Sequence, residues 1–413
     1  MQRLAYDVVV VGGGIIGTAT ARELLLRNPG LKLALVEKEK AIAQHQSGHN
    51  SGVVHSGLYY TPGSLKAKLC VEGLDLAYQY CTKKNIPYKK CGKLVVAVEP
   101  EEIGRLGALY RRALENGVKD IRLLGPEDIR KMEPHIQGLK AIWSPSTGIV
   151  DWKQVTRCYA DDCRTSGADL YLDFEVKHFV ARGESGCLVC GKSTSIPCKW
   201  VVTCGGLQSD LLSGLTGCPP APQIVPFRGE YLVLKPEKAK MISTNIYPVP
   251  HPGLPFLGVH FTPRMDGSVW LGPNAVLAFK REGYRFSDLN PRDLSRLITS
   301  QGLRKLAGKH LLFGLNEMYK SFNIGAQVAV LKKYFPPLTT SDVVRGPSGV
   351  RAQAIAEDGE LVDDFVFDEG REEFRGRVLH VRNAPSPAAT SSLAIAKVVA
   401  DKAEELFRLH SPS

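Results

Sequence analysis

The stretch VVVVGGGIIGTATARELLLRNPGLKLALVEKE, residues 8–39, decides the fold of this chain. Four successive valines at 8–11 favour a strand that is buried on both faces of a parallel sheet. Residues 15–27 have the pattern of a helix, which the following Asn-Pro-Gly ends, and residues 33–36 form a second apolar strand. The stretch therefore predicts a strand–helix–strand unit of an α/β fold.

The glycines of this unit have the GxGxxG spacing of a dinucleotide site. Gly12 permits a tight turn, Gly14 lets the backbone approach a pyrophosphate, and Gly17 lets the helix pack closely on the strand. The first N–H groups of the helix, around Ile15 and Ile16, then point at the phosphates. The unit therefore predicts dinucleotide binding.

An acidic residue ends the second strand. Glu37 lies twenty residues after Gly17 and precedes Lys38. A carboxylate at this distance accepts a hydrogen bond from a ribose 2′-hydroxyl and disfavours a 2′-phosphate, which argues against NADP.

The next segment distinguishes FAD from NAD. Residues 47–60, SGHNSGVVHSGLYY, are a polar, glycine-rich loop where an NAD enzyme would have a crossover helix. Such a loop can follow a long ligand closely, and no second GxGxxG follows a strand. The sequence therefore favours FAD, with a partner other than NAD. The loop residues expected at the cofactor are Ser47, His49, Asn50, Ser51 and Gly52.

The composition is that of a globular protein. The chain has 413 residues, 44% of them hydrophobic, and a net charge of +11. The basic residues are dispersed without a nucleic-acid-binding motif, so we expect a basic surface that attracts anions and no nucleic-acid partner. No apolar run reaches membrane-spanning length. The strand pattern begins by Asp7, which favours a cytosolic protein or one whose targeting segment is removed.

The ten cysteines show no zinc-finger spacing. Cys187 and Cys190 form a CxxC in a segment that resembles a strand, where residues i and i+3 point to opposite faces. We expect reduced, structural cysteines and no metal site.

Several motifs resemble a known group of flavoproteins. The first unit, the NSG loop, VVTCGGLQSDLL (201–212) and GVRAQAI (349–355) resemble the FAD-dependent D-amino-acid oxidase and glycine oxidase superfamily. Later motifs are similar to the L-2-hydroxyglutarate dehydrogenase family within it: HNSGVVHSGLYYTPGSLKAKLC, VPFRGEYLVL, IYPVPHPGLPFLGVHFT, LVDDF and NAPSPAATSSLAIA. The resemblance covers nearly the whole chain.

The resemblance implies a discontinuous, Rossmann-like FAD-binding domain in an α/β fold that is α+β overall. The α/β patterns place this domain at residues 1–90, 150–215 and 340–413. Residues 91–149 and 216–339 then form the substrate domain. The alternating strand patterns in the latter segment predict an antiparallel sheet.

The resemblance also implies the reaction. It is the oxidation of L-2-hydroxyglutarate, a small dicarboxylate, to 2-oxoglutarate by hydride transfer to flavin N5. The electrons pass to an acceptor other than NAD, with a quinone and an electron-transfer flavoprotein as candidates. Mitochondrial localisation and peripheral membrane association are further expectations. Two alternatives stay open: a peroxide-producing oxidase of an amino acid or secondary amine, and a catalytically inactive flavin-binding scaffold.

Oxidation beside a carboxylate requires a cation for the carboxylate and a base for the hydroxyl proton. Arg351, in GVRAQAI, is the expected cation because its guanidinium matches a carboxylate with two parallel hydrogen bonds. His260, in FLGVHFT, and His55, in the glycine-rich loop, are rival bases because imidazole titrates near neutral pH. The second carboxylate needs another anchor, for which the candidates are Tyr59, Lys66, Arg228 and Tyr231.

Small residues precede the last predicted helix. Ala389, Thr390 and Ser391 allow close approach of the backbone, and the N-terminus of the helix would stabilise negative charge on the reduced flavin. Simple N-capping by Thr390 or Ser391 is the alternative. The resemblance assigns four further residues to the cofactor site: Val176, Cys204, Gly205 and Gly349.

Overall fold

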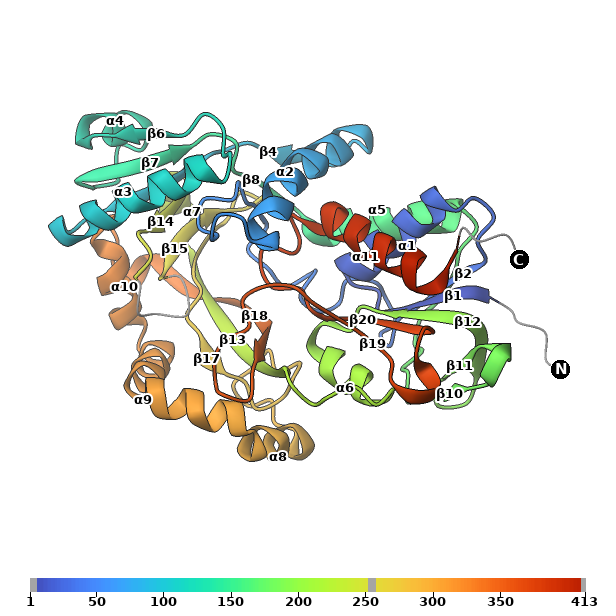
Figure 1. The fold of residues 1–413 in the computed structure, drawn as a ribbon. Coiled ribbons are helices and arrows are strands. Elements are labelled where there is room, and N and C mark those ends of the chain that lie inside the picture. The colour runs from blue at the N-terminus through green and yellow to red at the C-terminus, as the bar shows by residue number, and fades with distance from the viewer. Residues whose placement is uncertain (1–5, 252–257, 410–413) are drawn as a thin grey trace.

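The computed structural model describes residues 6–251 and 258–409. Two large sheets organise the chain (Figure 1). The first sheet has eight strands, five of which run parallel in the order β20 (Val378–Asn383), β12 (Ser195–Thr203), β1 (Tyr6–Val11), β2 (Leu33–Val36) and β9 (Asp169–Tyr171). Antiparallel strands extend it: β10 (His178–Ala181), β11 (Cys187–Cys190) and β19 (Val366–Glu369).

Both faces of β1 are buried, as the valine run predicts. Val8 and Val10 pack on the face covered by helices, while Val9 and Val11 belong to a separate apolar cluster. The helices on the first face lie together on one side of the sheet in Figure 1. They are α1 (Ile15–Arg27), α2 (Leu65–Lys83), α5 (Trp152–Thr165) and α11 (Ser392–Phe407). The α1 and β2 bounds match the sequence prediction.

The second sheet has nine strands and is antiparallel except where β14 pairs with β5. Eight strands follow the order β17 (Val276–Leu277), β13 (Gln223–Leu234), β16 (Val269–Gly272), β15 (His260–Pro263), β14 (Asn245–Pro248), β5 (Lys93–Ala97), β7 (Lys140–Ser144) and β6 (Arg122–Leu124). The ninth strand, β18 (Val343–Ile355), pairs with β13. The antiparallel character predicted from alternation is present.

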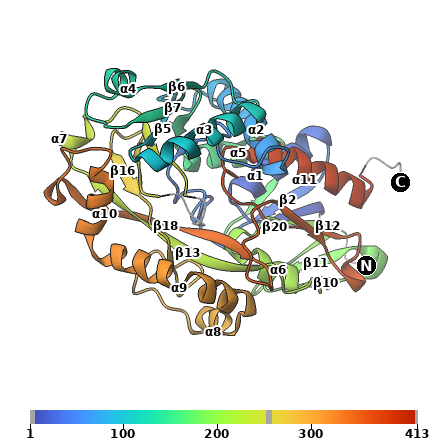
Figure 2. The same ribbon diagram turned by 60° about the vertical axis from the view of Figure 1, so that its left-hand side comes forward.

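One boundary of the expected domain division does not coincide with the arrangement of the sheets. We expected residues 340–413 in the first domain, but β18 pairs with β13 along its whole length in the second sheet. Figure 2 shows these two long strands running together. The sequence of a strand shows its alternation of apolar and polar residues but not which strand it pairs with. GVRAQAI lies near the start of residues 340–413, and we assigned it to the first domain with the rest of that segment. We propose that the division falls after β18.

The remaining elements surround these sheets. A small sheet joins β3 (Val53–Val54), β8 (Gly148–Val150) and β4 (Tyr88–Lys89). The other helices are α3 (Pro100–Glu115), α4 (Pro126–Met132), α6 (Ser209–Gly214), α7 (Pro236–Ala239), α8 (Pro291–Thr299), α9 (Gln301–Phe322) and α10 (Ile324–Lys332). In the part of the chain that the structure describes, no helix is both long enough and apolar enough to cross a membrane.

Close packing of α1 on β1 depends on Gly17. A Cβ atom at this position would lie 1.9 Å from the carbonyl oxygen of Gly12. We therefore expect Gly17→Ala to destabilise the protein by about 3 kcal/mol and to reduce bound cofactor, because the backbone must move. Gly104→Ala, at an exposed α3 position where a Cβ would meet nothing within 4 Å, is the matched control.

Urea unfolding and the 450 nm absorbance of purified protein measure both effects. Gly104→Ala should be neutral or stabilising by about 0.5–1 kcal/mol. Equal stability of the two alanine variants would show that the close approach at Gly17 is unimportant.

A buried ion pair links the two sheets' connecting segments. Arg281 Nη1 and Nη2 lie 2.6 and 2.8 Å from the two carboxylate oxygens of Asp210, and both side chains are almost fully buried. Asp210 also accepts a hydrogen bond from the Ile224 backbone, and Arg281 donates to the Leu207 carbonyl. The pair thus holds α6 and the turn before it against the segment that follows β17.

We expect Asp210→Asn to lower the free energy of unfolding by about 3 kcal/mol, because the buried guanidinium loses its nearer carboxylate and keeps only Asp293, 3.8 Å from its Nε. Asp161→Asn, which breaks an exposed pair with Arg164, should change it by less than about 0.5 kcal/mol. Denaturant unfolding of both variants measures the difference. Similar small effects would mean that the Arg281 pair contributes little.

Candidate active site

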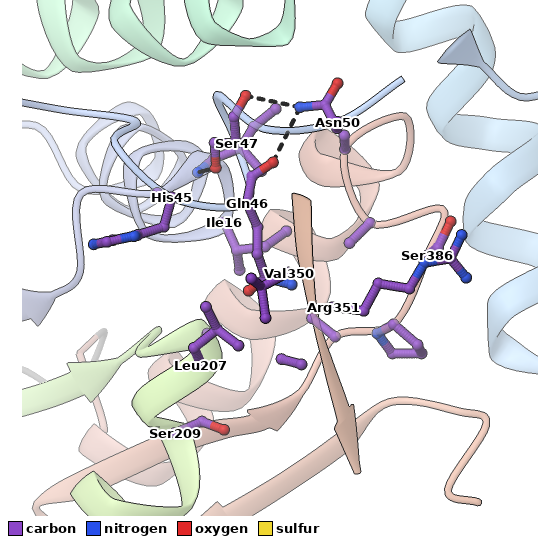
Figure 3. Close-up of a pocket in the computed structure, with 18 of the residues that line it drawn as sticks. Ile16, His45, Gln46, Ser47, Asn50, Leu207, Ser209, Val350, Arg351 and Ser386 are labelled. Atoms are coloured by element: carbon purple, nitrogen blue, oxygen red, sulfur yellow. Dashed lines mark hydrogen bonds between the residues drawn. The ribbon is translucent and has the colours of Figure 1, made fainter. Parts of the chain in front are cut away.

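A cavity of about 1330 Å³ lies between the glycine turn after β1 and the strands of the second sheet. Its volume exceeds the range of about 300–1,000 Å³ that is usual for small-ligand pockets, which leaves room for a cofactor together with a substrate. Figure 3 shows loop residues Gln46, Ser47 and Asn50 around the cavity with Val350 and Arg351 of β18.

The glycine turn has the geometry of a phosphate-binding site. Gly12 has a φ of +117°, in the region that favours glycine, and a Cβ there would lie 2.4 Å from the Cys204 carbonyl oxygen. A Cβ on Gly14 would meet only Ser47 Oγ, at 3.4 Å. The Ile15 N–H donates to the same oxygen at 2.8 Å, and the first turn of α1 has no acidic residue. This helix N-terminus therefore fits an anionic diphosphate.

The structure places Glu37 and Lys38 at the same end of the cavity. The Glu37 carboxylate accepts hydrogen bonds from the backbones of Gly13, at 2.7 Å, and Glu39, at 2.9 Å. These contacts fix it at the end of β2, where a ribose hydroxyl would meet its remaining lone pairs. Gly17 does not line the cavity in the described structure, which agrees with a packing role.

Lys38 belongs to a charged cluster. Glu39, His45 and Glu282 bring one ligand atom each within 4.8 Å of one another. The Lys38 ammonium contacts all three, at 2.9 Å from both Glu282 and His45 and in a shorter contact with Glu39. Lys38 thus neutralises the carboxylates, and its ammonium is engaged within the protein.

The loop residues divide between lining and support. Ser47, His49, Asn50, Ser51 and Gly52 all line the cavity. The Asn50 amide, however, donates to the backbone carbonyls of Gln46 and Ser47 (Figure 3) and accepts from the Gly52 N–H. Its side chain therefore shapes the loop. His49 donates from Nδ1 to the Ser348 carbonyl at 3.1 Å and stacks on Tyr284.

The segment before α11 also contributes. Ala389 and Thr390 line the cavity, and Thr390 Oγ1 accepts a hydrogen bond from the His55 backbone at 3.0 Å. Ser391 is fully buried outside the lining, and although it is the N-cap residue its side chain makes no capping hydrogen bond. The N-capping alternative is therefore wrong for Ser391. The other cofactor residues assigned by resemblance all line the cavity: Val176, Cys204, Gly205 and Gly349.

The expected catalytic side chains meet in this one cavity, although they come from distant segments. His55, His260 and Arg351 line it, as do three of the expected anchors for the second carboxylate: Tyr59, Lys66 and Tyr231. The prediction of Arg228 as the fourth anchor is wrong. Arg228 is 1% exposed, donates to Glu230 at 3.0 Å and to the Arg285 carbonyl at 3.2 Å, and does not line the cavity. Glu230, two residues later on β13, forms an ion pair with the Arg228 guanidinium.

His260 has its tautomer set by the backbone. Its Nδ1 lies 3.0 Å from the Gly258 carbonyl oxygen, so Nδ1 must donate and Nε2 keeps its lone pair. The ring stacks on Tyr247 with a centroid distance of 4.0 Å. Burial lowers the pKa of His260 to about 3, with the charges of Lys93 and Arg351 acting in the same direction and the Gly258 carbonyl opposing them. An anionic ligand would raise this pKa and make the imidazole a better base.

His55 is less constrained. Its Nδ1 is buried and has no hydrogen-bond partner among the described residues. Burial lowers its pKa well below the usual value, and the charges of Lys93, His260 and Arg351 add to this effect. An unpartnered buried ring nitrogen in a cavity is suited to a ligand contact. The geometry therefore favours His260 as the base and His55 as a substrate or cofactor contact.

Lys93, which the motifs did not indicate, is the charged residue that sequence reasoning missed. It starts β5 in an entirely buried segment, KLVVA, and is itself 1% exposed. Its charge acts on both His55 and His260. The available signal was a lysine that begins an apolar strand, but most such lysines are exposed at the strand end.

The chain is similar to known proteins over nearly its whole length. The family described as FAD dependent oxidoreductase (DAO) matches residues 7–402. The protein named L-2-hydroxyglutarate dehydrogenase, mitochondrial, of Nematostella vectensis is 60% identical over 98% of this chain and 91% of its own length. The protein of the same name in Homo sapiens is 55% identical over 98% of this chain and 90% of its own length.

Solved structures share the fold. An L-alpha-glycerophosphate oxidase from Mycoplasma pneumoniae with FAD bound has a TM-score of 0.76 and 24% identity, with 98% of this chain and 94% of that chain covered. A glycine oxidase from Bacillus cereus has a TM-score of 0.68 and 20% identity, with 97% and 95% covered. The family match and the relatives at 55–60% identity show that this chain belongs to the FAD dependent oxidoreductase family and, within it, to the L-2-hydroxyglutarate dehydrogenases.

Proposed function

We propose that this protein oxidises L-2-hydroxyglutarate to 2-oxoglutarate with FAD as its cofactor. One observation supports the proposal most strongly: Arg351, His260 and the glycine turn all line the same cavity. The Gly258 carbonyl holds His260 in the tautomer that leaves Nε2 unprotonated. FAD, when bound, supplies an acceptor for the hydride at its N5 atom. The relatives named above are dehydrogenases, which supports this function over the oxidase alternative.

The protein's own residues supply binding and proton transfer. Arg351 binds the C1 carboxylate beside the reacting alcohol, because its guanidinium can donate two parallel hydrogen bonds. His260 accepts the hydroxyl proton at Nε2, the nitrogen that the Gly258 carbonyl leaves unprotonated. Cations that line the cavity, including Lys66 and Arg112, favour a dianionic substrate. Ala389 and Thr390, before the N-terminus of α11, are suited to the flavin ring.

The acceptor and location are further parts of the proposal. We propose a quinone or an electron-transfer flavoprotein as acceptor, with peripheral association at a membrane as one way to reach a quinone. The relatives' names include "mitochondrial", and we propose the same compartment here.

Turnover with an artificial dye acceptor tests the function. L-2-Hydroxyglutarate should be oxidised, while D-2-hydroxyglutarate and glycine should not. Peroxide release at the rate of turnover in air would favour the oxidase alternative. Lack of turnover with all three substrates would favour a catalytically inactive scaffold.

A further inference from the structure

Lys93 is a buried cation without an acidic partner in the described structure. It lies in β5, between β14 and β7, and is 1% exposed. No carboxylate among residues 6–251 and 258–409 forms an ion pair with it, and the ionisable groups that act on it most are the thiols of Cys70 and Cys91. Burying an ammonium in this way is costly unless an anion compensates it.

The Lys93 ammonium lies against two aromatic rings that line the cavity, while Lys93 itself is not among the lining residues of the described structure. Its Nζ is 4.0 Å from the ring centre of Tyr247 and 5.2 Å from that of Tyr59, and both tyrosines line the cavity. Tyr247 in turn stacks on His260. The charge of Lys93 acts more strongly than that of Arg351 on both histidines, His55 and His260. The charge of Lys93 would therefore attract an anion that contacts these histidines.

The other candidate cations are less suited to a second carboxylate. The Lys66 ammonium lies 3.4 Å from the carboxylate of Asp363, a largely exposed residue. Arg228 forms an ion pair with Glu230, whereas no such pair involves Lys93 in the part of the chain that the structure describes. Tyr59 and Tyr231 are buried phenols whose pKa burial raises, so they offer neutral hydrogen bonds only.

We propose that Lys93 binds the second carboxylate of the substrate and thereby selects dicarboxylates over monocarboxylates. The inference rests on the proposed function, in which Arg351 binds the first carboxylate. In the free protein, the rings of Tyr59 and Tyr247 contact the ammonium. When substrate binds, its carboxylate supplies the anionic partner that the buried ammonium lacks.

The proposal has a consequence for pH. Burial lowers the pKa of Lys93 to about 7, and the charges of Cys70 and Cys91 oppose this shift. The ammonium is fully present below this pKa and is lost as the pH rises through it. Because only the charged form attracts a carboxylate, affinity for a dicarboxylate should fall above pH 7, whereas affinity for a monocarboxylate should fall less.

Lys93→Met in the FAD-loaded protein tests the assignment. We expect kcat/KM for L-2-hydroxyglutarate to fall about 100-fold, because a charge-assisted contact is lost. For L-2-hydroxypentanoate, a monocarboxylate of the same chain length, the change should stay below about 3-fold. Lys333→Met, at an exposed site, should leave both values unchanged.

A binding measurement separates selectivity from turnover and from misfolding. Glutarate and valerate are titrated into each protein at pH 6 to 9, with the dissociation constant measured by calorimetry. In wild type, glutarate should bind more weakly as the pH rises above 7. Lys93→Arg, which keeps its charge, should retain the preference for glutarate and lose this pH dependence, because arginine stays protonated.

Two outcomes would overturn the proposal. Equal losses for the dicarboxylate and the monocarboxylate in Lys93→Met would indicate a structural or general catalytic role. A selective loss in Lys66→Met instead would assign the second carboxylate to Lys66. If wild type prefers glutarate but does not oxidise L-2-hydroxyglutarate, the proposed function fails while the binding assignment can still be judged.

Discussion

Replacement of Arg351 by methionine is expected to lower kcat/KM for L-2-hydroxyglutarate by about 10³-fold, while FAD stays bound. The guanidinium orients the substrate through its C1 carboxylate, so both binding and alignment are lost, and about 4 kcal/mol of transition-state stabilisation corresponds to this factor. Arg351 lies in the middle of β18 at the cavity and is not needed for the glycine turn. Steady-state kinetics and the flavin absorbance of the purified variant measure the two effects.

Two further variants test whether the effect is specific to the Arg351 guanidinium. Arg351→Lys keeps the charge but loses the planar fork, so it should recover only part of the activity. Arg375→Met, at an exposed residue far along the chain from β18, should behave as wild type. An unchanged kcat/KM in Arg351→Met would contradict the assignment of the carboxylate to this residue.

His260→Asn is expected to have the second large effect, a loss of about 10²–10⁴-fold in kcat. The asparagine amide can replace the imidazole Nδ1 as donor to the Gly258 carbonyl, but it provides no base at the Nε2 position. KM should change little, because substrate charge is bound elsewhere. His55→Asn is the matched variant, and a larger loss of kcat there would exchange the roles of the two histidines.

The pH profile provides an independent check on His260. Burial lowers its pKa to about 3, so the imidazole is neutral, and competent as a base, at all higher pH values. The kcat/KM profile, which reports the free enzyme, should therefore show no His260-dependent decline between pH 8 and about 5. A decline in this range that His260→Asn abolishes would contradict the proposed state of the imidazole.

Local sequence determined the first unit well. Gly12 has a φ that favours glycine and Gly17 packs against the Gly12 carbonyl, and α1 and β2 have the predicted bounds. The glycine-rich loop was also correctly placed at the cavity. These features are predictable because their physical causes lie within a few residues of one another.

Long-range packing decided what the sequence did not predict. β18 pairs with β13, which lies more than 100 residues earlier in the chain, so the sequence of β18 alone does not reveal its partner. Lys93 is buried because its strand, β5, lies between β14 and β7. Arg228 had the right residue type for an anchor, but Glu230, two residues later, binds it. Charge and motif alone do not show which of several cations faces a cavity.

The most direct test of the central claim is the absorption spectrum of the purified protein before and after anaerobic addition of L-2-hydroxyglutarate. The structure predicts a yellow protein with flavin bands that bleach on addition of this substrate, because the glycine turn binds FAD beside a cavity for a 2-hydroxy acid. A colourless protein that fails to take up FAD and instead binds NAD would contradict the account.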